Sequence, residues 1–387
     1  MACCKTCSQE NCKKHSFLIG KPRLIDKIQG STPPEVFIGK WNYPNVYAGI
    51  LAPQEYGDTK ILSSPEIWHA KKLQINEVLK LRQQLIYGRQ RASVKKPQAS
   101  KLLPVLHEVA MTHKSVALEL SLKKPIEQHK EKDSKTPLIS NAAEINYAKL
   151  EENAPVKPKI DCLVNDIHAK SSESIIELDS SGIPTSSIIK LLSVGLLGLA
   201  SRRKLVPTRW SITAVDDTLS KEKLKRIRYY PEIQDYQVFH AEYIGNHYEF
   251  LLLPEKWSFE VLEISLASFG VWHDYESFFP RKKYAQDVTG AYYANRLALT
   301  EYLDKIKRQA SCIVLRQIGT EYYAPLGVGI LRQISREAFS KPALSFSTLK
   351  EALENIQSRL RVHIDNYLSK SIILQNYGKQ KKLSQFF

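Results

Sequence analysis

The sequence predicts an α+β fold with mixed helices and antiparallel strands, and three observations support this prediction. Short apolar runs bounded by Pro and Gly, of which Val36–Ile38 is the first, indicate the strands of a small sheet. The stretch Pro65–Tyr87 carries its apolar residues at a spacing close to the helical period, which indicates an amphipathic helix. The second half mixes both patterns without regular alternation, which is typical of α+β proteins.

The second half of the chain contains the clearest periodic patterns. Residues 346–373 place an apolar side chain at every third or fourth position, which is typical of a helix. The tripeptide Ile244–Asn246 interrupts a Tyr- and Phe-rich strand pattern and predicts a turn between two strands. The other elements expected here are a helix over Ile188–Ala200, strands within Tyr243–Ile264, a helix over Ala291–Gln309 and a buried strand over Ser311–Ile318.

Composition divides the chain into five segments. Hydrophobic residues make up 43% of it, with 16 Gly and 19 Pro, and these shares exclude a collagen-like or wholly disordered protein. Residues 121–180 are rich in Lys, Glu and Pro, so we expect a variable or flexible insert that buries too little surface to offset its ordering entropy. The remaining segments are a Cys-rich zinc module (1–20), an N-terminal part of the body (21–120), a C-terminal α+β body (181–373) and a flexible tail (374–387).

The charge balance indicates a polyanionic partner. The chain has 56 Lys and Arg against 40 Asp and Glu, which gives a formal net charge of +16 and favours nucleic acid as a ligand. The most apolar stretch, Ile188–Ala200, is too short to span a bilayer, and the N-terminus lacks the apolar core of a secretory signal. We therefore expect a cytoplasmic protein without a membrane partner.

The last eight residues form a compact recognition pattern. Gln380 is followed three positions later by Leu383, and then by Phe386 and Phe387. In one tight turn the three apolar side chains project to one side and form a plug that a groove of a partner can bury. This arrangement matches the peptide with which many proteins bind the ring-shaped DNA sliding clamp, proliferating cell nuclear antigen (PCNA). The tail therefore predicts PCNA as a partner.

The N-terminus carries four of the six cysteines. Cys4, Cys7, Cys12 and His15 have the spacing C-x2-C-x4-C-x2-H, which can supply four ligands to a tetrahedral zinc ion. Cys3 is an alternative ligand, and a metal-free, redox-labile N-terminus is the other interpretation of this segment. The pattern predicts a structural zinc module.

Two basic segments are candidates for DNA contact. Basic residues with an interleaved aromatic residue suit phosphate contact combined with base stacking. The residues concerned are Arg202, Arg203, Lys204, Arg209 and Trp210 in the first segment, and Arg281, Lys282 and Lys283 in the second.

Two groups of acidic and histidine residues are candidates for chemistry. Asp216 and Asp217 could hold Mg²⁺ or Mn²⁺, as a phosphoryl-transfer enzyme requires, although Asp residues before a helical pattern more commonly cap that helix. Glu242, His247 and Glu249 could assemble a second metal site across two strands, where a histidine is more often structural.

Six segments of the chain resemble the archaeal Nre family of DNA-repair proteins. They cover both halves and exclude the 121–180 insert; they are 31–53, 63–72, 201–220, 245–264, 284–303 and 321–339. The resemblance implies a role in the repair of DNA damage, a Cys-rich N-terminus of the zinc-finger type and, in many members, a clamp-binding tail. It transfers no catalytic residue, and the family head has four cysteines where this chain offers His15 or Cys3 as the fourth ligand.

The sequence thus predicts a DNA-repair factor that binds DNA and that its tail recruits to the sliding clamp. Two other functions stay open. One is a metal-dependent nuclease or other DNA-modifying repair enzyme that uses the carboxylates above, and the other is a non-catalytic adaptor that recruits a further repair protein.

Overall fold

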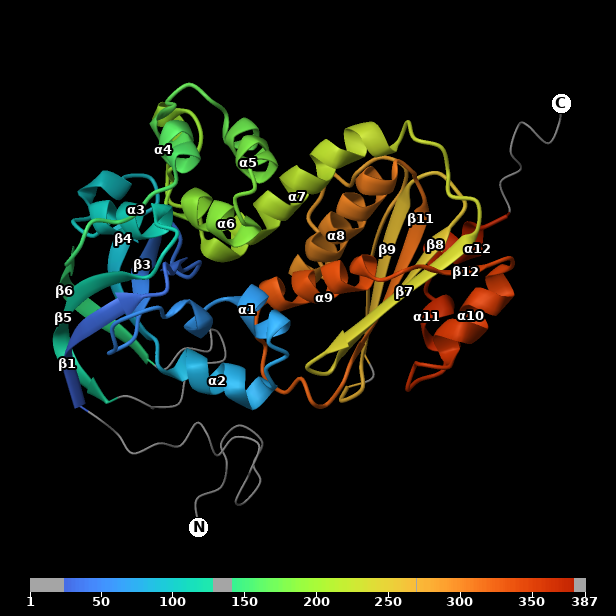
Figure 1. Cartoon of the computed structure of the whole chain (residues 1–387), viewed down its shortest axis with the longest axis horizontal. Helices are drawn as coiled ribbons and strands as arrows, with labels where there is room; N and C mark the ends of the chain where they lie inside the picture. Colours follow the sequence, from blue (N-terminus) through green and yellow to red (C-terminus); the bar gives the residue numbers. More distant parts are fainter. Residues whose placement is uncertain (1–23, 128–140, 269, 379–387) are drawn as a thin grey trace, which may run out of the picture. The chain divides into compact units, whose positions relative to one another are not determined.

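The computed structural model describes residues 24–127, 141–268 and 270–378, which fold into two compact units that divide between Val215 and Asp216 (Figure 1). Each unit contains one six-stranded mixed sheet together with helices, so the predicted α+β class is confirmed. The predicted zinc module and clamp-binding peptide lie outside the described residues. Among the helices of the described ranges, none is both long and apolar enough to cross a membrane.

The first unit is built on a sheet with the strand order β1-β5-β6-β4-β3-β2. Neighbouring strands are antiparallel, except that β4 and β6 run parallel. The strands are β1 (Leu24–Thr32), β2 (Val36–Ile38), β3 (Asn45–Ala52), β4 (Ile86–Ser93), β5 (Val116–Glu127) and β6 (Asn141–Leu150). Its α-helices are α1 (Pro65–Ala70), α2 (Ile75–Gln83), α3 (Leu103–Met111), α4 (Pro158–Asn165), α5 (Ser171–Ser180) and α6 (Thr185–Ser193). The described part of this unit also contains the short 3-10 helices η2 (Lys60–Leu62), η3 (Pro97–Ala99) and η4 (Ala200–Arg202).

The helix predicted over Pro65–Tyr87 is two helices followed by a strand. Lys72 has a positive φ of 51°, which a helix does not accommodate, so the chain breaks between α1 and α2. The N-terminus of α2 is then fixed by the side chain of Glu77, which accepts a hydrogen bond from the backbone N–H of Gln74. The apolar spacing indicated the buried face of both helices but carried no signal for the break.

The stretch 121–180, which we expected to be an insert, contains regular structure in its described part. It holds the end of β5, all of β6, α4 and α5. Several of its few apolar residues lie on the inner faces of these elements: Ile145 and Leu178 are fully buried, and Ile160 is 2% exposed. Residues 128–140 lie outside the described part of the chain.

The helix α7 (Thr208–Ile227) contains the boundary between the two units. It begins eight residues before Asp216, so the interpretation of Asp216 and Asp217 as helix-capping residues is wrong. The pattern after Asp217 is the continuation of a helix that already starts at Thr208, because no Gly or Pro interrupts residues 208–227.

The second unit contains a sheet with the order β10-β9-β11-β8-β7-β12, in which only β9 and β11 are parallel neighbours. The strands are β7 (Tyr236–Tyr243), β8 (Asn246–Leu253), β9 (Ser258–Ser265), β10 (Val271–Glu276), β11 (Ser311–Ile318) and β12 (Leu344–Phe346). The helices are α8 (Gly290–Ile306), α9 (Val328–Ser340), α10 (Leu349–Gln357), α11 (Asp365–Leu368) and α12 (Ile372–Asn376). The predicted strand over Ser311–Ile318 is confirmed, and so is the turn predicted over Ile244–Asn246, except that Asn246 already belongs to β8.

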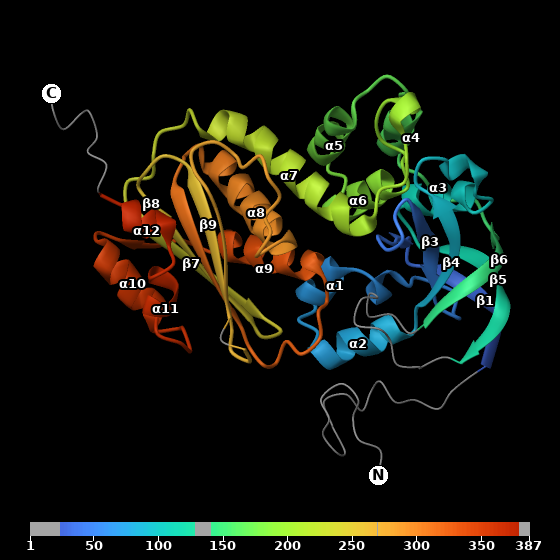
Figure 2. The same cartoon turned by 180° about the vertical axis from the view of Figure 1, so that it is seen from behind.

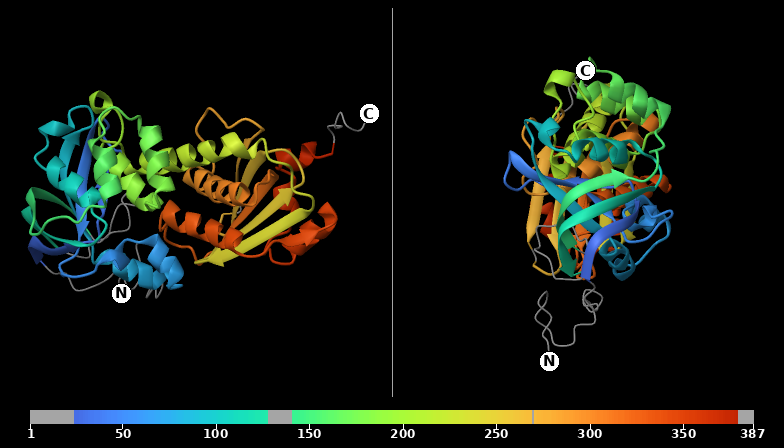
Figure 3. Two further views of the ribbon diagram at one scale, coloured as in Figure 1. Left: turned by 45° about the horizontal axis from the view of Figure 1, so that its top comes forward. Right: turned by 90° about the vertical axis from the view of Figure 1, so that its left-hand side faces the viewer.

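Helices cover both faces of this second sheet (Figures 2 and 3). On one face, Phe250 of β8 lies 4.7 Å from Phe339 of α9, measured between ring centroids. On the other face, Leu251 and Leu253 belong to a buried cluster with Ile356 and other residues of the segment that holds α10, α11 and α12. Because both faces are covered, all eight residues of β8 are buried, which explains its uninterrupted apolar run from Phe250 to Leu253.

The C-terminal helix α12 is tied firmly to this sheet. The buried carboxylate of Glu260 on β9 accepts hydrogen bonds from the Ser371 hydroxyl and from the backbone N–H groups of Ile372 (2.6 Å) and Ile373 (3.3 Å). One turn further on, the hydroxyl groups of Tyr377 and Tyr236 lie 2.8 Å apart and form a hydrogen bond. These contacts cap the first turn of the helix and hold the chain against β7 and β9 as far as Tyr377.

Candidate functional site

The start of α7 organises a surface of the first unit. The backbone N–H of Ile38, at the end of β2, donates a 2.9 Å hydrogen bond to the hydroxyl of Thr208, the first residue of α7. Thr208 is 8% exposed, so this contact lies in the interior of the unit. It joins the turn after β2 to the first turn of the helix, although the two segments are 170 residues apart in the sequence.

This contact brings exposed aromatic residues together. The rings of Tyr43 and Trp210 lie 5.3 Å apart between centroids, and the two side chains are 46% and 47% exposed. Trp41 is 52% exposed, and the Lys40 ammonium lies 4.6 Å from the centre of its ring. Arg209 is also exposed. We call Lys40, Trp41, Tyr43, Arg209 and Trp210 the aromatic surface.

The basic residues predicted beside this surface have different roles. Arg202 and Lys204 are exposed. Arg203 turns inward, and its guanidinium donates three 2.8 Å hydrogen bonds to the backbone carbonyls of Gly198, Val164 and Asp166. All three guanidinium nitrogens of Arg203 are thus engaged within the protein, so Arg203 stabilises the loop before α7 and leaves phosphate contact to its neighbours.

The second predicted basic segment lies in the second unit. Arg281 holds its own loop, because its guanidinium pairs with Asp274 at 2.6 Å and donates to the backbone carbonyls of Lys283 and Tyr284. Lys282 and Lys283 are exposed. Nearby in the sequence, Phe279 is 69% exposed. The loop thus presents two exposed cations, Lys282 and Lys283, and the exposed ring of Phe279, over which the Arg228 guanidinium lies at 5.5 Å.

The two aspartates of α7 serve as partners of buried arginines. Asp216 is fully buried and forms a two-pronged ion pair with Arg332 of α9, with nitrogen to oxygen distances of 3.0 and 2.7 Å. Asp217 pairs with the buried Arg296 of α8 and, at 2.7 Å, with Lys221. In the described ranges, no group of three or more His, Cys, Asp or Glu residues could hold a metal ion. The geometry therefore favours a structural role for both aspartates.

The second predicted cluster is a network of charges on the β7–β8 hairpin. The ring nitrogens of His247 lie 2.8 Å from Glu249 and 3.2 Å from Glu242. Burial lowers the pKa of His247, but its hydrogen bonds to the two carboxylates outweigh this effect, so the pKa is raised. Glu249 is fully buried and pairs with Arg359 at 2.7 and 2.8 Å. The structure brings the three predicted residues together, and Arg359 compensates the charge of Glu249.

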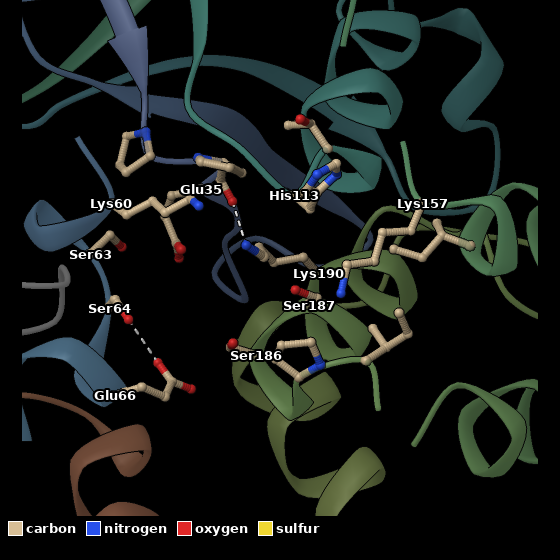
Figure 4. Close-up of a pocket in the computed structure, with 16 residues that line it drawn as sticks. Glu35, Lys60, Ser63, Ser64, Glu66, His113, Lys157, Ser186, Ser187 and Lys190 are labelled. Carbon is tan, nitrogen blue, oxygen red and sulfur yellow. Dashed lines mark hydrogen bonds between the residues drawn. The ribbon is translucent and has the colours of Figure 1, made fainter. Parts of the chain in front are cut away.

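A cavity of about 360 Å³ lies in the first unit, beside the N-terminus of α6 (Figure 4). Lys60, Lys157 and Lys190 reach it from three different segments, and Ser186 and Ser187 line it from the first turn of α6. We call these five residues and the space between them the lysine cavity. Ligand sites commonly have this size and a few convergent polar groups, so the lysine cavity is a second candidate site.

Burial shifts the pKa values of two groups that line the lysine cavity. It raises the pKa of Glu35, although the nearby Lys190 and Arg82 oppose this shift. It lowers the pKa of Lys190, which Glu35 opposes in turn. Both shifts have the same physical origin, because a charged form loses hydration when the surrounding protein excludes water. Such perturbed groups in a cavity are typical of functional sites.

Comparison with known proteins identifies the family. The family model for the N-terminal part of archaeal Nre matches residues 8–272, and the model for the C-terminal part matches residues 276–386. The chain belongs to the archaeal Nre family. The predicted resemblance to Nre proteins is therefore confirmed, and it extends through the 121–180 stretch that the six resembling segments left out.

Individual Nre relatives are similar over most of their length. The DNA repair protein NreB of Archaeoglobus fulgidus is 34% identical over 389 residues, which cover 98% of this chain and 97% of NreB. The DNA repair protein NreA of the same organism is 31% identical over 392 residues, or 98% of this chain and 96% of NreA. NreA of Haloferax volcanii is 29% identical over 362 residues, or 89% of this chain and 86% of that protein. No solved structure matches the chain.

Two parts of the candidate sites in this Nre chain escaped prediction from the sequence. Tyr43 lies in a turn whose sequence predicts only a connection between two strands. Its contact with Trp210 is what makes it a candidate site residue. The lysines of the cavity are scattered between positions 60 and 190 and follow no motif spacing. The sequence did contain a signal for Tyr43, because the turn 39–44 holds two aromatic residues, Trp41 and Tyr43, among polar neighbours.

Replacing Asp216 will test whether this residue is structural. The variant Asp216→Asn leaves the buried Arg332 without a counter-charge, so we expect it to lose about 3–5 kcal/mol of unfolding free energy in a urea titration. The matched control is Glu354→Gln, which removes an exposed ion pair with Lys350 at 3.9 Å and should change the unfolding free energy by less than about 0.5 kcal/mol. Equal unfolding midpoints for the two variants would contradict the structural role.

Proposed function

We propose that this chain is a DNA-repair factor that binds DNA through the aromatic surface and is recruited to the sliding clamp by its C-terminal peptide. The observation that carries the proposal is the half-exposed pair Tyr43 and Trp210 beside cationic side chains. The relatives NreA and NreB, which are named DNA repair proteins, give the family context.

The exposed rings favour a ligand with flat apolar faces. Burying a large aromatic side chain is favourable by roughly 1.5–3 kcal/mol, so rings left half exposed at the surface forgo this gain unless a partner covers them. Nucleic-acid bases stack on such rings in any sequence, and the adjacent Lys40 and Arg209 can contact the phosphates between stacked bases. Single-stranded DNA has its bases accessible for this contact.

The overall charge supports the same ligand. A net charge of +16 draws a polyanion to the protein over a distance set by ionic strength. The exposed Arg202 and Lys204 precede the aromatic surface in the sequence, and in the second unit Lys282 and Lys283 offer a further basic loop. Binding through these groups should weaken steeply with added salt, because each phosphate contact releases a bound counterion.

The C-terminal peptide would bring the chain to DNA by binding the sliding clamp. Gln380, Leu383, Phe386 and Phe387 have the spacing of sliding-clamp ligands, and tethering to PCNA would raise the local concentration of the chain at DNA by effective molarity. The body would then bind DNA that the clamp encircles.

A binding role is favoured over the two alternatives. A metal-dependent nuclease needs carboxylates that are free to bind Mg²⁺ or Mn²⁺, whereas both oxygens of Asp216 bind Arg332, and Glu249 binds Arg359. A non-catalytic adaptor needs a surface for another protein, and the 121–180 stretch in which we expected that surface folds in part as β6, α4 and α5 of the first unit. DNA binding gives the aromatic surface a role, because bases stack on exposed rings.

Removing the rings should weaken binding to single-stranded DNA. We expect Tyr43→Ala and Trp210→Ala each to raise the Kd for a fluorescent poly-thymidine oligonucleotide, measured by anisotropy, by about 5- to 150-fold, since stacking of one base is worth about 1–3 kcal/mol. Tyr56→Ala removes a ring that is 57% exposed and hydrogen-bonded to Glu151, and it should leave the Kd unchanged. If all three variants bound equally well, the aromatic surface would not be the DNA site.

Replacing the two phenylalanines of the tail should weaken its binding to PCNA. The double variant Phe386→Ala with Phe387→Ala should lower the affinity for purified PCNA at least about 100-fold in a titration calorimetry experiment, because two apolar anchors lose their burial. Gln385→Ala changes a position between the anchors and serves as the control with near-normal affinity. Undiminished PCNA binding by the double variant would refute the assignment of the tail.

The N-terminal cysteines should hold zinc. We propose that Cys4, Cys7, Cys12 and His15 are the ligands, with Cys3 as the alternative fourth donor, and we expect about one zinc per chain by elemental analysis. Cys7→Ser should abolish this zinc, whereas Cys162→Ser, which changes an exposed free cysteine of the first unit, should retain it. A chain that carries no zinc, or that keeps its zinc after Cys7→Ser, would exclude the module.

A further inference from the structure

The lysine cavity contains positive charge that its own carboxylates, Glu35 and Glu66, neutralise only in part. Within the described ranges, neither Lys60 nor Lys157 forms an ion pair with a carboxylate. The Lys190 ammonium donates a 2.6 Å hydrogen bond to the backbone carbonyl of Pro34, which is neutral. Figure 4 shows the three side chains approaching one space from different segments of the chain. Three like charges that share a cavity repel one another, so an anionic ligand would relieve a cost that folding alone leaves in place.

The two acidic residues that line the lysine cavity are already engaged. Glu35 lies near both Lys190 and Arg82, and the arginine donates a 2.9 Å hydrogen bond to Ser63 at the cavity wall. Glu66 accepts a 3.0 Å hydrogen bond from the hydroxyl of Ser64 at the start of α1. With Arg82, four cations stand against the two carboxylates Glu35 and Glu66 at the lysine cavity, so a net positive charge is left for a ligand.

The helix α6 adds a further site for negative charge. Its N-cap residue is Pro184, whose side chain offers no acceptor to the first N–H groups of the helix. The carbonyl of Pro184 accepts from the backbone N–H groups of Ser187 (2.9 Å) and Ile188 (3.1 Å), which lie later in the first turn. The hydroxyl-bearing residues Ser186 and Ser187 line the cavity at this positive end of the helix dipole.

We propose that the lysine cavity binds a terminal phosphate group, with Lys60, Lys157 and Lys190 as counter-charges and the N-terminal turn of α6 as hydrogen-bond donor. A phosphate monoester carries close to two negative charges and several acceptor oxygens, so it satisfies several ammonium groups and hydroxyls at once. A carboxylate offers one charge and two oxygens and would leave part of the cavity unpaired. The volume of about 360 Å³ accommodates a phosphate together with the sugar that bears it.

Terminal phosphate can come from two sources, which a binding experiment separates. One source is the 5′ or 3′ phosphate at a DNA end, and the other is a small molecule such as a nucleoside monophosphate or inorganic phosphate. The first would make the cavity a sensor of strand breaks, whereas the second would make it a site for a nucleotide or a free anion. The proposal itself concerns the phosphate group common to both, and it stands whether or not the aromatic surface binds DNA.

The experiment measures binding of the full-length chain to four probes. We use inorganic phosphate and thymidine monophosphate in titration calorimetry, and in anisotropy measurements we compare an oligonucleotide that carries a 5′ or 3′ phosphate with the same oligonucleotide ending in hydroxyl groups. We expect at least one phosphate probe to bind, and we expect Lys157→Gln and Lys60→Gln each to raise its Kd about tenfold or more, as loss of a charged hydrogen bond predicts. Lys101→Gln makes the same charge change at an exposed position away from the cavity and should have no effect.

Each outcome decides between the possibilities. If the chain prefers the phosphorylated oligonucleotide and Lys157→Gln abolishes this preference, the ligand is a DNA end. If only the small probes bind, the ligand is a nucleotide or free phosphate. Absence of binding by all phosphate probes, or equal loss in Lys157→Gln and Lys101→Gln, overturns the proposal. Ser187→Ala, which keeps every charge, supplies a second variant in case a lysine variant unfolds. Trp210→Ala should leave the small-probe Kd unchanged, so failure of the DNA surface and failure of the cavity remain distinguishable.

Discussion

Burial of two arginines in the second unit is the constraint to which its helices conform. Arg296 of α8 and Arg332 of α9 are both almost fully buried, and a guanidinium removed from water is costly unless carboxylates surround it. Two neighbouring residues of α7, Asp216 and Asp217, supply those carboxylates, and Glu276 at the end of β10 adds another to Arg296 at 2.7 Å. Consecutive positions on a helix project about 100° apart, so the pair of aspartates can address two helices at once. This geometry explains an acidic doublet that resembles metal ligands when only the sequence is considered.

Much of the fold could be predicted from the sequence because its patterns are local. The strand Ser311–Ile318 and the turn at Ile244–Gly245 depend on residues that are neighbours in the chain. The ends of helices were harder to predict from the sequence. Lys307 ends α8 in a left-handed conformation that glycine usually adopts, and nothing in its residue type signals this. The single helix expected over 346–373 is three helices, since its apolar spacing continues through the breaks between α10, α11 and α12.

In the candidate sites too, the features that depend on local sequence could be predicted and those that depend on tertiary contacts could not. Arg209 and Trp210 could be found because a basic and aromatic run has a recognisable composition, but the inward turn of Arg203 in that run could not. The partner ring of Trp210 comes from a turn 167 residues earlier, and the lysine cavity gathers side chains from three segments. Sites of this kind arise from tertiary contacts such as the hydrogen bond between Ile38 and Thr208, and one sequence carries no record of which distant segments meet.

The contacts that hold α12 against the second sheet limit the length of chain that could connect this unit to a clamp. The chain is fixed to the second sheet as far as Tyr377, and Leu383 is the first apolar residue of the proposed clamp peptide. Six residues can span at most about 20 Å when fully extended. A clamp bound to the proposed peptide would therefore stay close to Tyr377, and the second unit would have little freedom to move away from it. Clamp binding through this tail would then constrain the position of the second unit on DNA as well as its partner.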